Sequence, residues 1–190
     1  MMLKELVLAA RSYRSFDESY TFTREMLLEY VDAARFCPSG RNLQPLKYRL
    51  VYEKEELDRL QPLTFWAAAL PDWQLPPEGK RPRGFIVICR DARLAEVPGS
   101  ANKDIGIVSE TMLLLAAEKG LGGCMIGNYD PKKVQAALGL EECFVPELIL
   151  ALGKPCEQVV LTEAGESITY YRDAAGVHYV PKRPLEELVL

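Results

Sequence analysis

The sequence predicts a single α+β domain, and three observations lead to that expectation. The chain has 190 residues, with 48% hydrophobic and 26% charged side chains, which suits one ordinary globular domain. Apolar residues recur at helical spacing in some segments and alternate with polar residues in others. These helical and strand patterns interleave without the strict strand–helix alternation of a doubly wound sheet. We therefore expect one layered domain over residues 1–190.

Helix signals lie both in the spacing of apolar residues and at the expected helix ends. Apolar spacing predicts a short helix near residues 3–10, and residues 54–70 are also expected to be helical. Thr23 is a good N-cap for another helix, because its hydroxyl can accept a hydrogen bond from the first turn. A longer helix is expected from about 102 to 119, with Gly120 well placed to end it.

Strand signals come from alternation and from short apolar runs. Tyr48, Leu50 and Tyr52 alternate with Lys47, Arg49 and Val51, which predicts a half-buried strand, whereas 85–89 and 148–152 are apolar runs typical of core strands. Residues 170–180 are expected to form a hairpin. Asp130, followed directly by a proline, predicts the start of one more helix.

Two segments are expected to extend from the domain. Residues 71–83 contain four prolines, which exclude regular structure there and make the segment a candidate flap or arm. Residues 180–190 form a C-terminal extension that carries two adjacent cations near its start.

Composition excludes several classes of function. A formal net charge of -4 argues against a nucleic-acid-binding protein, and no apolar stretch is long enough to span a membrane. The first residues do not resemble a secretory signal, and the five cysteines lack the spacing of a disulfide or zinc framework. We therefore expect a cytoplasmic protein with reduced thiols. A single histidine makes a catalytic metal centre improbable.

Basic residues at the two ends of the chain are candidate phosphate ligands. Arg11 and Arg14 flank Ser12, and this grouping can surround a phosphate with charge-assisted hydrogen bonds. Lys182 and Arg183 are able to complete such a site. The alternative is that both groups are solvated surface charges, the usual role of such residues.

A stiff polar loop between a helix and a strand is a candidate ring-binding segment. Prolines bound the loop 38–45, and Ser39, Asn42 and Gln44 place donors and acceptors at close spacing. A flat heteroaromatic ring with carbonyl and imide edges needs that mixture of groups. The alternative is a turn in which these side chains satisfy only their own backbone.

The glycine-rich segment 120–127 follows the long expected helix. Its glycines allow a ligand to approach the backbone closely, and Met125 and Ile126 can offer an apolar surface to a ring. It matches neither a dinucleotide-binding fingerprint nor a P-loop, and no strand precedes it. A helix end leading into a core strand explains the same residues.

The order and spacing of these segments resemble the FMN-dependent nitroreductase family, of the short type with about 190 residues. That family has an N-terminal RRSxRxF segment, then PSxxNxQPW, then a DxGxxxxxxxLxAxxxGLG helix, and a basic pair near the C-terminus. The matching positions here are Arg11, Ser12, Arg14 and Phe16; Pro38, Ser39, Asn42, Gln44 and Pro45; Asp104, Gly106, Leu114, Ala116, Gly120, Leu121 and Gly122; and Lys182 and Arg183.

The resemblance implies a mixed sheet flanked by helices, in an intertwined homodimer with two FMN sites at the interface. By that likeness the FMN phosphate and ribityl chain would be held by Arg11, Ser12, Arg14, Lys182 and Arg183. The flavin would be met by Ser39, Asn42 and Gln44, typically from the neighbouring chain, and its ring would lie along Met125, Ile126 and Gly127. Electrons would pass from NADH or NADPH to a small oxidised acceptor, such as a nitroaromatic or a quinone, in a ping-pong cycle. The flavin N5 would be the reacting centre, with no catalytic side chain.

Some features depart from the family pattern. Ala10 stands where many members have an arginine, which puts the strength of the phosphate grip in doubt, and Leu46 replaces a tryptophan.

Cys124 and His178 are more simply explained as a packing cysteine and a strand residue than as reactive groups. A specialised flavin enzyme (a dehalogenase, a dehydrogenase or a flavin-destroying enzyme) and a non-catalytic flavin-binding dimer, its pocket blocked around Trp66 and Trp73, remain alternatives.

Overall fold

A strand that is buried on both faces, β3 (Gly84–Asp91), lies at the centre of the main sheet. The computed structural model describes residues 2–97 and 99–190; Met1 and Pro98, which the expected domain over 1–190 includes, lie outside the described residues. β3 pairs antiparallel with β2 (Leu46–Val51) on one side and with β5 (Phe144–Pro155) on the other. The far edge of β5 pairs antiparallel with β4 (Gly122–Ile126) and, at its end, with β1 (Phe16–Asp17).

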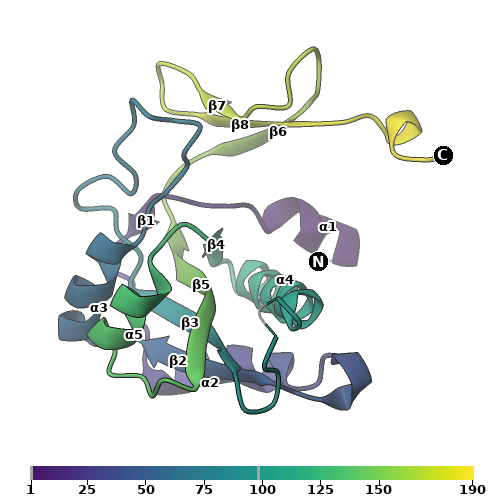
Figure 1. Ribbon diagram of the computed structural model, residues 1–190. Helices are drawn as coiled ribbons and strands as arrows, with labels where there is room; N and C mark the ends of the chain where they lie inside the picture. The colour runs from purple at the N-terminus through teal and green to yellow at the C-terminus, as the bar shows by residue number, and fades with distance from the viewer. Residues whose placement is uncertain (1, 98) are drawn as a thin grey trace.

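Alternating side chains of β3 build a separate core on each face of the main sheet. Ile86 and Ile88 join a cluster with residues of α2 (Arg24–Ala34) and α4 (Asn102–Glu118). Phe85 and Val87 point the other way, into a cluster with residues of α3 (Lys54–Leu60) and α5 (Pro131–Ala137). The sheet is therefore sandwiched between two pairs of helices (Figure 1).

A second, smaller sheet lies apart from the first, at the top of Figure 1. In this C-terminal sheet, β8 (His178–Lys182) pairs parallel with β6 (Val159–Glu163) and antiparallel with β7 (Tyr171–Arg172). Helix α1 (Leu3–Ala9) lies between it and α4 in Figure 1. The expected α+β class with helices flanking the sheet is confirmed, and the mixed strand pairing belongs to the C-terminal sheet.

Several local predictions are confirmed by hydrogen bonds and dihedral angles. The Thr23 hydroxyl accepts a hydrogen bond from the Met26 amide at 3.3 Å and so caps α2. The Asp130 carboxylate accepts from the Lys132 amide at 2.9 Å at the start of α5. Gly120, which follows α4, has the positive φ of 70° typical of a helix end. The hairpin of β7 and β8 lies where residues 170–180 predicted it.

The prediction of a helix over 54–70 is wrong beyond its first half. α3 ends at Leu60, a single 3₁₀ turn covers Gln61–Leu63, and the chain is irregular from residue 64 onward. Pro62 explains the difference, because proline has no amide hydrogen to continue the helical ladder. Two strands, β1 and β6, were not predicted at all.

The remaining segments carry short turns or no regular structure. The other 3₁₀ turns are Gly40–Asn42 and Leu185–Glu187. Residues 71–83 contain neither helix nor strand, as their prolines predicted. Within the described parts of the chain, none of the helices combines the length and the apolar character that crossing a membrane requires.

Candidate functional site

Basic residues from the two ends of the chain meet in one cavity of about 370 Å³, which we call the basic cavity. Arg11, Ser12 and Arg14 line it from the N-terminal segment, and Lys182 lines it from the end of β8. Met125 of β4 reaches it as well and is 37% exposed. The structure thus brings together five of the residues that the sequence singled out. Glu110 of α4 also lines the cavity and is its one acidic lining residue among the described parts of the chain.

Close backbone packing explains why the N-terminal segment lies against β4. The amide of Tyr13 donates to the Gly123 carbonyl at 2.9 Å, and Ser12 forms a parallel bridge with Gly123. A β-carbon on Gly123 would lie 2.3 Å from the carbonyl oxygen of Ala151, so no larger residue fits there. The glycine-rich segment therefore serves strand packing, and through it positions Arg11 to Arg14 beside Met125.

A second cavity of about 210 Å³, the side cavity, adjoins the basic cavity. The two cavities share Arg14, Met125 and Tyr170 as lining residues. Ile126 and Gly127 line only the side cavity, opposite the irregular segment 65–68. This aromatic and apolar lining suits a flat organic molecule.

The polar loop 38–45 lines a different cavity from the basic residues. Its Ser39 hydroxyl donates to the Asp104 carboxylate at 2.5 Å and accepts from the Gln44 amide at 2.9 Å. The Gln44 side chain donates to the Asn42 side-chain oxygen at 3.1 Å. Ser39 and Gln44 line a separate cavity of about 210 Å³ beside α4. Within one chain, therefore, Ser39, Asn42 and Gln44 do not join the basic cavity.

The backbone of this loop is strained. Arg41, Asn42 and Gln44 have φ angles of 56°, 55° and 50°, in the left-handed region that favours glycine. Each such residue costs of order 1–3 kcal/mol, and such strain gathers at ligand sites and switches. The hydrogen bonds from Ser39 and Gly40 to Asp104 hold the loop in this conformation.

The two adjacent C-terminal cations lie in different surroundings. Lys182 lines the basic cavity, whereas Arg183 does not. The Arg183 guanidinium instead forms an ion pair with Glu187 at 3.0 Å, and both side chains are about half exposed. The structure therefore separates this pair, which the sequence suggested would act together.

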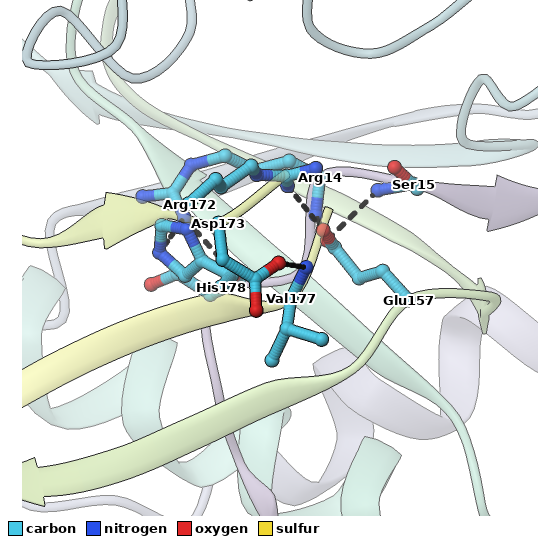
Figure 2. A network of polar contacts seen from close by, with 8 residues as sticks. Arg14, Ser15, Glu157, Arg172, Asp173, Val177 and His178 are labelled. Carbon is cyan, nitrogen blue, oxygen red and sulfur yellow. Dashed lines mark hydrogen bonds and ion pairs between the residues drawn. The ribbon is translucent and has the colours of Figure 1, made fainter. Parts of the chain in front are cut away.

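A buried polar network next to the basic cavity was not found from the sequence (Figure 2). The Glu157 carboxylate accepts hydrogen bonds from the backbone amides of Arg14 and Ser15 and pairs with the Arg172 guanidinium. His178 lies against Arg14, with 3.1 Å between its Nε2 and the arginine Nη1. Arg14 and Glu157 are 143 residues apart in the chain, so no local pattern reveals the contact. The one available signal was the chain's single histidine, which the sequence placed in a strand.

Cys124, which lines the side cavity, is a buried packing thiol. Cys124 is 5% exposed, and burial raises the pKa of its thiol to about 11. A thiol with so high a pKa carries little thiolate near neutral pH and is a poor nucleophile. Among residues 2–97 and 99–190, no three His, Cys, Asp or Glu side chains gather as metal ligands would.

Comparison with known protein families shows which family the chain belongs to. The model of the nitroreductase family matches residues 7–83 and 85–154. The chain belongs to the nitroreductase family. The predicted site residues of the N-terminal segment, the polar loop and β4 lie within the matched ranges, whereas Lys182 and Arg183 lie beyond them.

Individual nitroreductase relatives agree with this assignment. The "Putative NAD(P)H nitroreductase YdgI" of Bacillus subtilis is 23% identical over 188 residues, covering 81% of this chain and 88% of the relative. A solved structure described as a "putative nitroreductase in complex with FMN", from Exiguobacterium sibiricum, is 20% identical with a TM-score of 0.71. It covers 100% of this chain and 97% of its own. An "FMN-dependent Nitroreductase" from Clostridium difficile is 23% identical with a TM-score of 0.65, covering 82% of this chain and 89% of its own. These structural likenesses confirm the fold.

Proposed function

We propose that this chain binds FMN and uses it to pass electrons from NADH or NADPH to a small oxidised acceptor, such as a quinone or a nitroaromatic compound. Family membership supports an oxidoreductase, and the relatives above carry NAD(P)H or FMN in their names. One observation carries the proposal for this chain. Arg11, Ser12, Arg14 and Lys182 converge on a cavity that shares its Met125 edge with an aromatic side cavity.

The residues of the basic cavity fit a phosphorylated ligand. Three cations line it, and the Nε atoms of Arg11 and Arg14 are buried without a hydrogen-bond partner among the described residues. Buried polar groups normally have partners, so these donors favour an anionic group at this place. Arg11, Ser12, Arg14 and Lys182 would hold the phosphate and its chain, and Met125, Ile126 and Gly127 would lie along the ring. Ala10 adds no charge to the cavity that it lines, so the grip depends on these residues.

A ping-pong order of reaction is part of the proposal. When bound, FMN supplies two-electron oxidation–reduction chemistry centred on its N5 atom. We propose that the nucleotide and the acceptor use the same side of the bound ring in turn. Trp66 lines the side cavity without filling it, and Trp73 lies instead over Arg172, 5.4 Å from the guanidinium carbon to the ring centre. This arrangement favours an accessible pocket over a blocked, non-catalytic one.

A homodimer is part of the proposal. Helix α1 has no buried residue, and its Leu3, Val7 and Leu8 are 67%, 42% and 52% exposed. The C-terminal residues Leu188 and Val189 are 64% and 68% exposed. A second copy that covers these side chains would gain the hydrophobic free energy that one chain leaves unused.

The dimer gives a role to residues that one chain keeps apart. Ser39, Asn42 and Gln44 would meet the flavin of the neighbouring chain, which agrees with their exposed, strained loop. Arg183, which lies outside the basic cavity of its own chain, would reach the cofactor only after a change of partner from Glu187. We propose one FMN-binding domain over residues 1–190, with 71–83 as a flap or arm and 180–190 as a C-terminal extension.

Purified protein tests this proposal directly. Protein loaded with FMN should oxidise NADH or NADPH in the presence of a quinone, with the parallel lines of a ping-pong mechanism in double-reciprocal plots. Sedimentation should show a dimer. Protein that takes up no FMN, or FMN-loaded protein without turnover on quinones and nitroaromatics, would contradict the proposed activity. Slow nucleotide oxidation with rapid turnover of one particular substrate would instead support a specialised flavin enzyme.

A further inference from the structure

Two buried arginines beside the basic cavity have different counter-groups. The Arg172 side chain is 4% exposed and pairs with the Glu157 carboxylate, whose side chain is 5% exposed. Arg14 is 9% exposed, and its Nη1 donates to the Ser12 carbonyl at 3.0 Å and contacts His178 Nε2 at 3.1 Å. Within the described residues, no carboxylate lies at ion-pair distance from the Arg14 guanidinium. The charge of Arg172 is therefore neutralised, whereas that of Arg14 is not.

The chemistry of the contact defines the state of His178. A guanidinium has only donors, so the Nε2 atom at 3.1 Å must accept the hydrogen bond. The ring proton then lies on Nδ1, which is buried without a hydrogen-bond partner among the described residues, and the imidazole is uncharged. His178 is 1% exposed, and the groups facing it are Arg14, Arg172 and the Tyr170 ring, whose centre is 5.3 Å from that of the imidazole. Protonation of His178 would place a further positive charge beside Arg14 and Arg172, which both repel it.

Because His178 accepts this hydrogen bond without carrying a charge, it does not neutralise the positive charge that Arg14 presents to the basic cavity. Buried arginines are usually paired with carboxylates, because an isolated buried charge is costly. A carboxylate at position 178 would satisfy Arg14 but would also cancel the charge that lines the cavity. A neutral imidazole fixes one guanidinium nitrogen and leaves the charge for a ligand, and the Arg14 Nε still has no partner among the described residues.

We propose that His178 is a positioning residue, an uncharged acceptor that orients Arg14 toward the basic cavity without neutralising it. This inference rests on the proposed FMN function for the identity of the ligand. The Glu157 carboxylate, which pairs with Arg172, also fixes the position of Arg14, because it accepts hydrogen bonds from the backbone amides of Arg14 and Ser15.

Two matched variants separate charge from hydrogen bonding. His178→Gln keeps an uncharged acceptor, whereas His178→Glu keeps an acceptor but adds a negative charge beside Arg14. FMN affinity, measured by fluorescence titration of flavin-stripped protein, should fall less than about threefold in the Gln variant. In the Glu variant it should fall at least about tenfold, the effect of losing one charge-assisted contact. Equal affinities of the two variants, with both shown to be folded by circular dichroism, would overturn the proposal.

A second measurement needs no substitution. The chain has one histidine, so ring ¹⁵N nuclear magnetic resonance of protein without a histidine tag reports His178 alone. Protonation on Nδ1 that persists from pH 8 to pH 5 is the expected result. Protonation on Nε2, or a midpoint near 6.5, would overturn the inference whatever the FMN affinity. A neutral Nδ1-protonated ring in protein that cannot bind FMN would instead contradict the proposed function and leave the arrangement of His178 intact.

Discussion

Removing the Glu157 carboxylate should destabilise the protein strongly, because it leaves Arg172 as a buried charge without a counter-ion. Both side chains are about 5% exposed or less, and the carboxylate also accepts the backbone amides of Arg14 and Ser15. Breaking a buried ion pair by removing one partner typically costs about 3–5 kcal/mol. At roughly 2–4 °C per kcal/mol for a chain of this size, Glu157→Ala should lower the melting temperature by roughly 6–20 °C.

A double variant separates the unpaired charge from the lost contacts. Glu157→Ala with Arg172→Met removes both charges and should recover a large part of the stability, because the remaining cost is the loss of two amide hydrogen bonds. Arg183→Ala is the matched control. It breaks the exposed Arg183–Glu187 pair and should change the free energy of unfolding by less than about 1 kcal/mol.

Urea unfolding followed by circular dichroism provides the free energies, and hydrogen exchange shows where the loss is felt. We expect the C-terminal sheet to lose protection first in Glu157→Ala, because this network joins it to the N-terminal segment. A loss below about 1 kcal/mol, or a double variant no more stable than the single one, would refute the account of an unpaired buried charge.

Three further predictions concern the cofactor, pH and backbone packing. Arg14→Ala should weaken FMN binding by about 1.5–3 kcal/mol in a fluorescence titration, and unchanged affinity would remove Arg14 from the site. Burial, Arg14 and Arg172 lower the pKa of His178 from 6.5 to about 4, so the unfolded chain binds a proton first as the pH falls. This pKa difference does not reduce the free energy of unfolding above pH 6.5. It should lower the free energy of unfolding by up to roughly 3 kcal/mol as the pH falls from about 6.5 to 4. His178→Gln should remove this part of the pH dependence in urea titrations, and an identical pH profile in both proteins would contradict it. Gly123→Ala should cost more than about 1 kcal/mol because its methyl group meets the Ala151 carbonyl at 2.3 Å. Gly127→Ala meets nothing within 4 Å and should change the melting temperature little, so equal melting temperatures of the two variants would count against this packing.

Much of the fold was predictable because its signals are local. Thr23, Asp130 and Gly120 mark helix ends through hydrogen bonds and dihedral angles within a few residues of themselves. The buried strand β3 was visible as an apolar run. The error over 54–70 is also local, because Pro62 takes one amide hydrogen out of the helical ladder. β1 and β6 were missed because a two-residue strand and a half-buried one carry too little pattern of their own.

Sequence by itself determined several of the helix ends, the core strands and the family, whose motifs are spaced along the chain. It also named Arg11, Ser12, Arg14 and Lys182 as residues for one anionic ligand. Only the tertiary structure decided that these four share a cavity, that Arg183 faces elsewhere, and that a neutral histidine rather than a carboxylate contacts Arg14. The physical reason is distance along the chain. Propensity and capping act over a few residues, whereas burial and charge pairing depend on which side chains the completed fold brings within a few ångströms of each other.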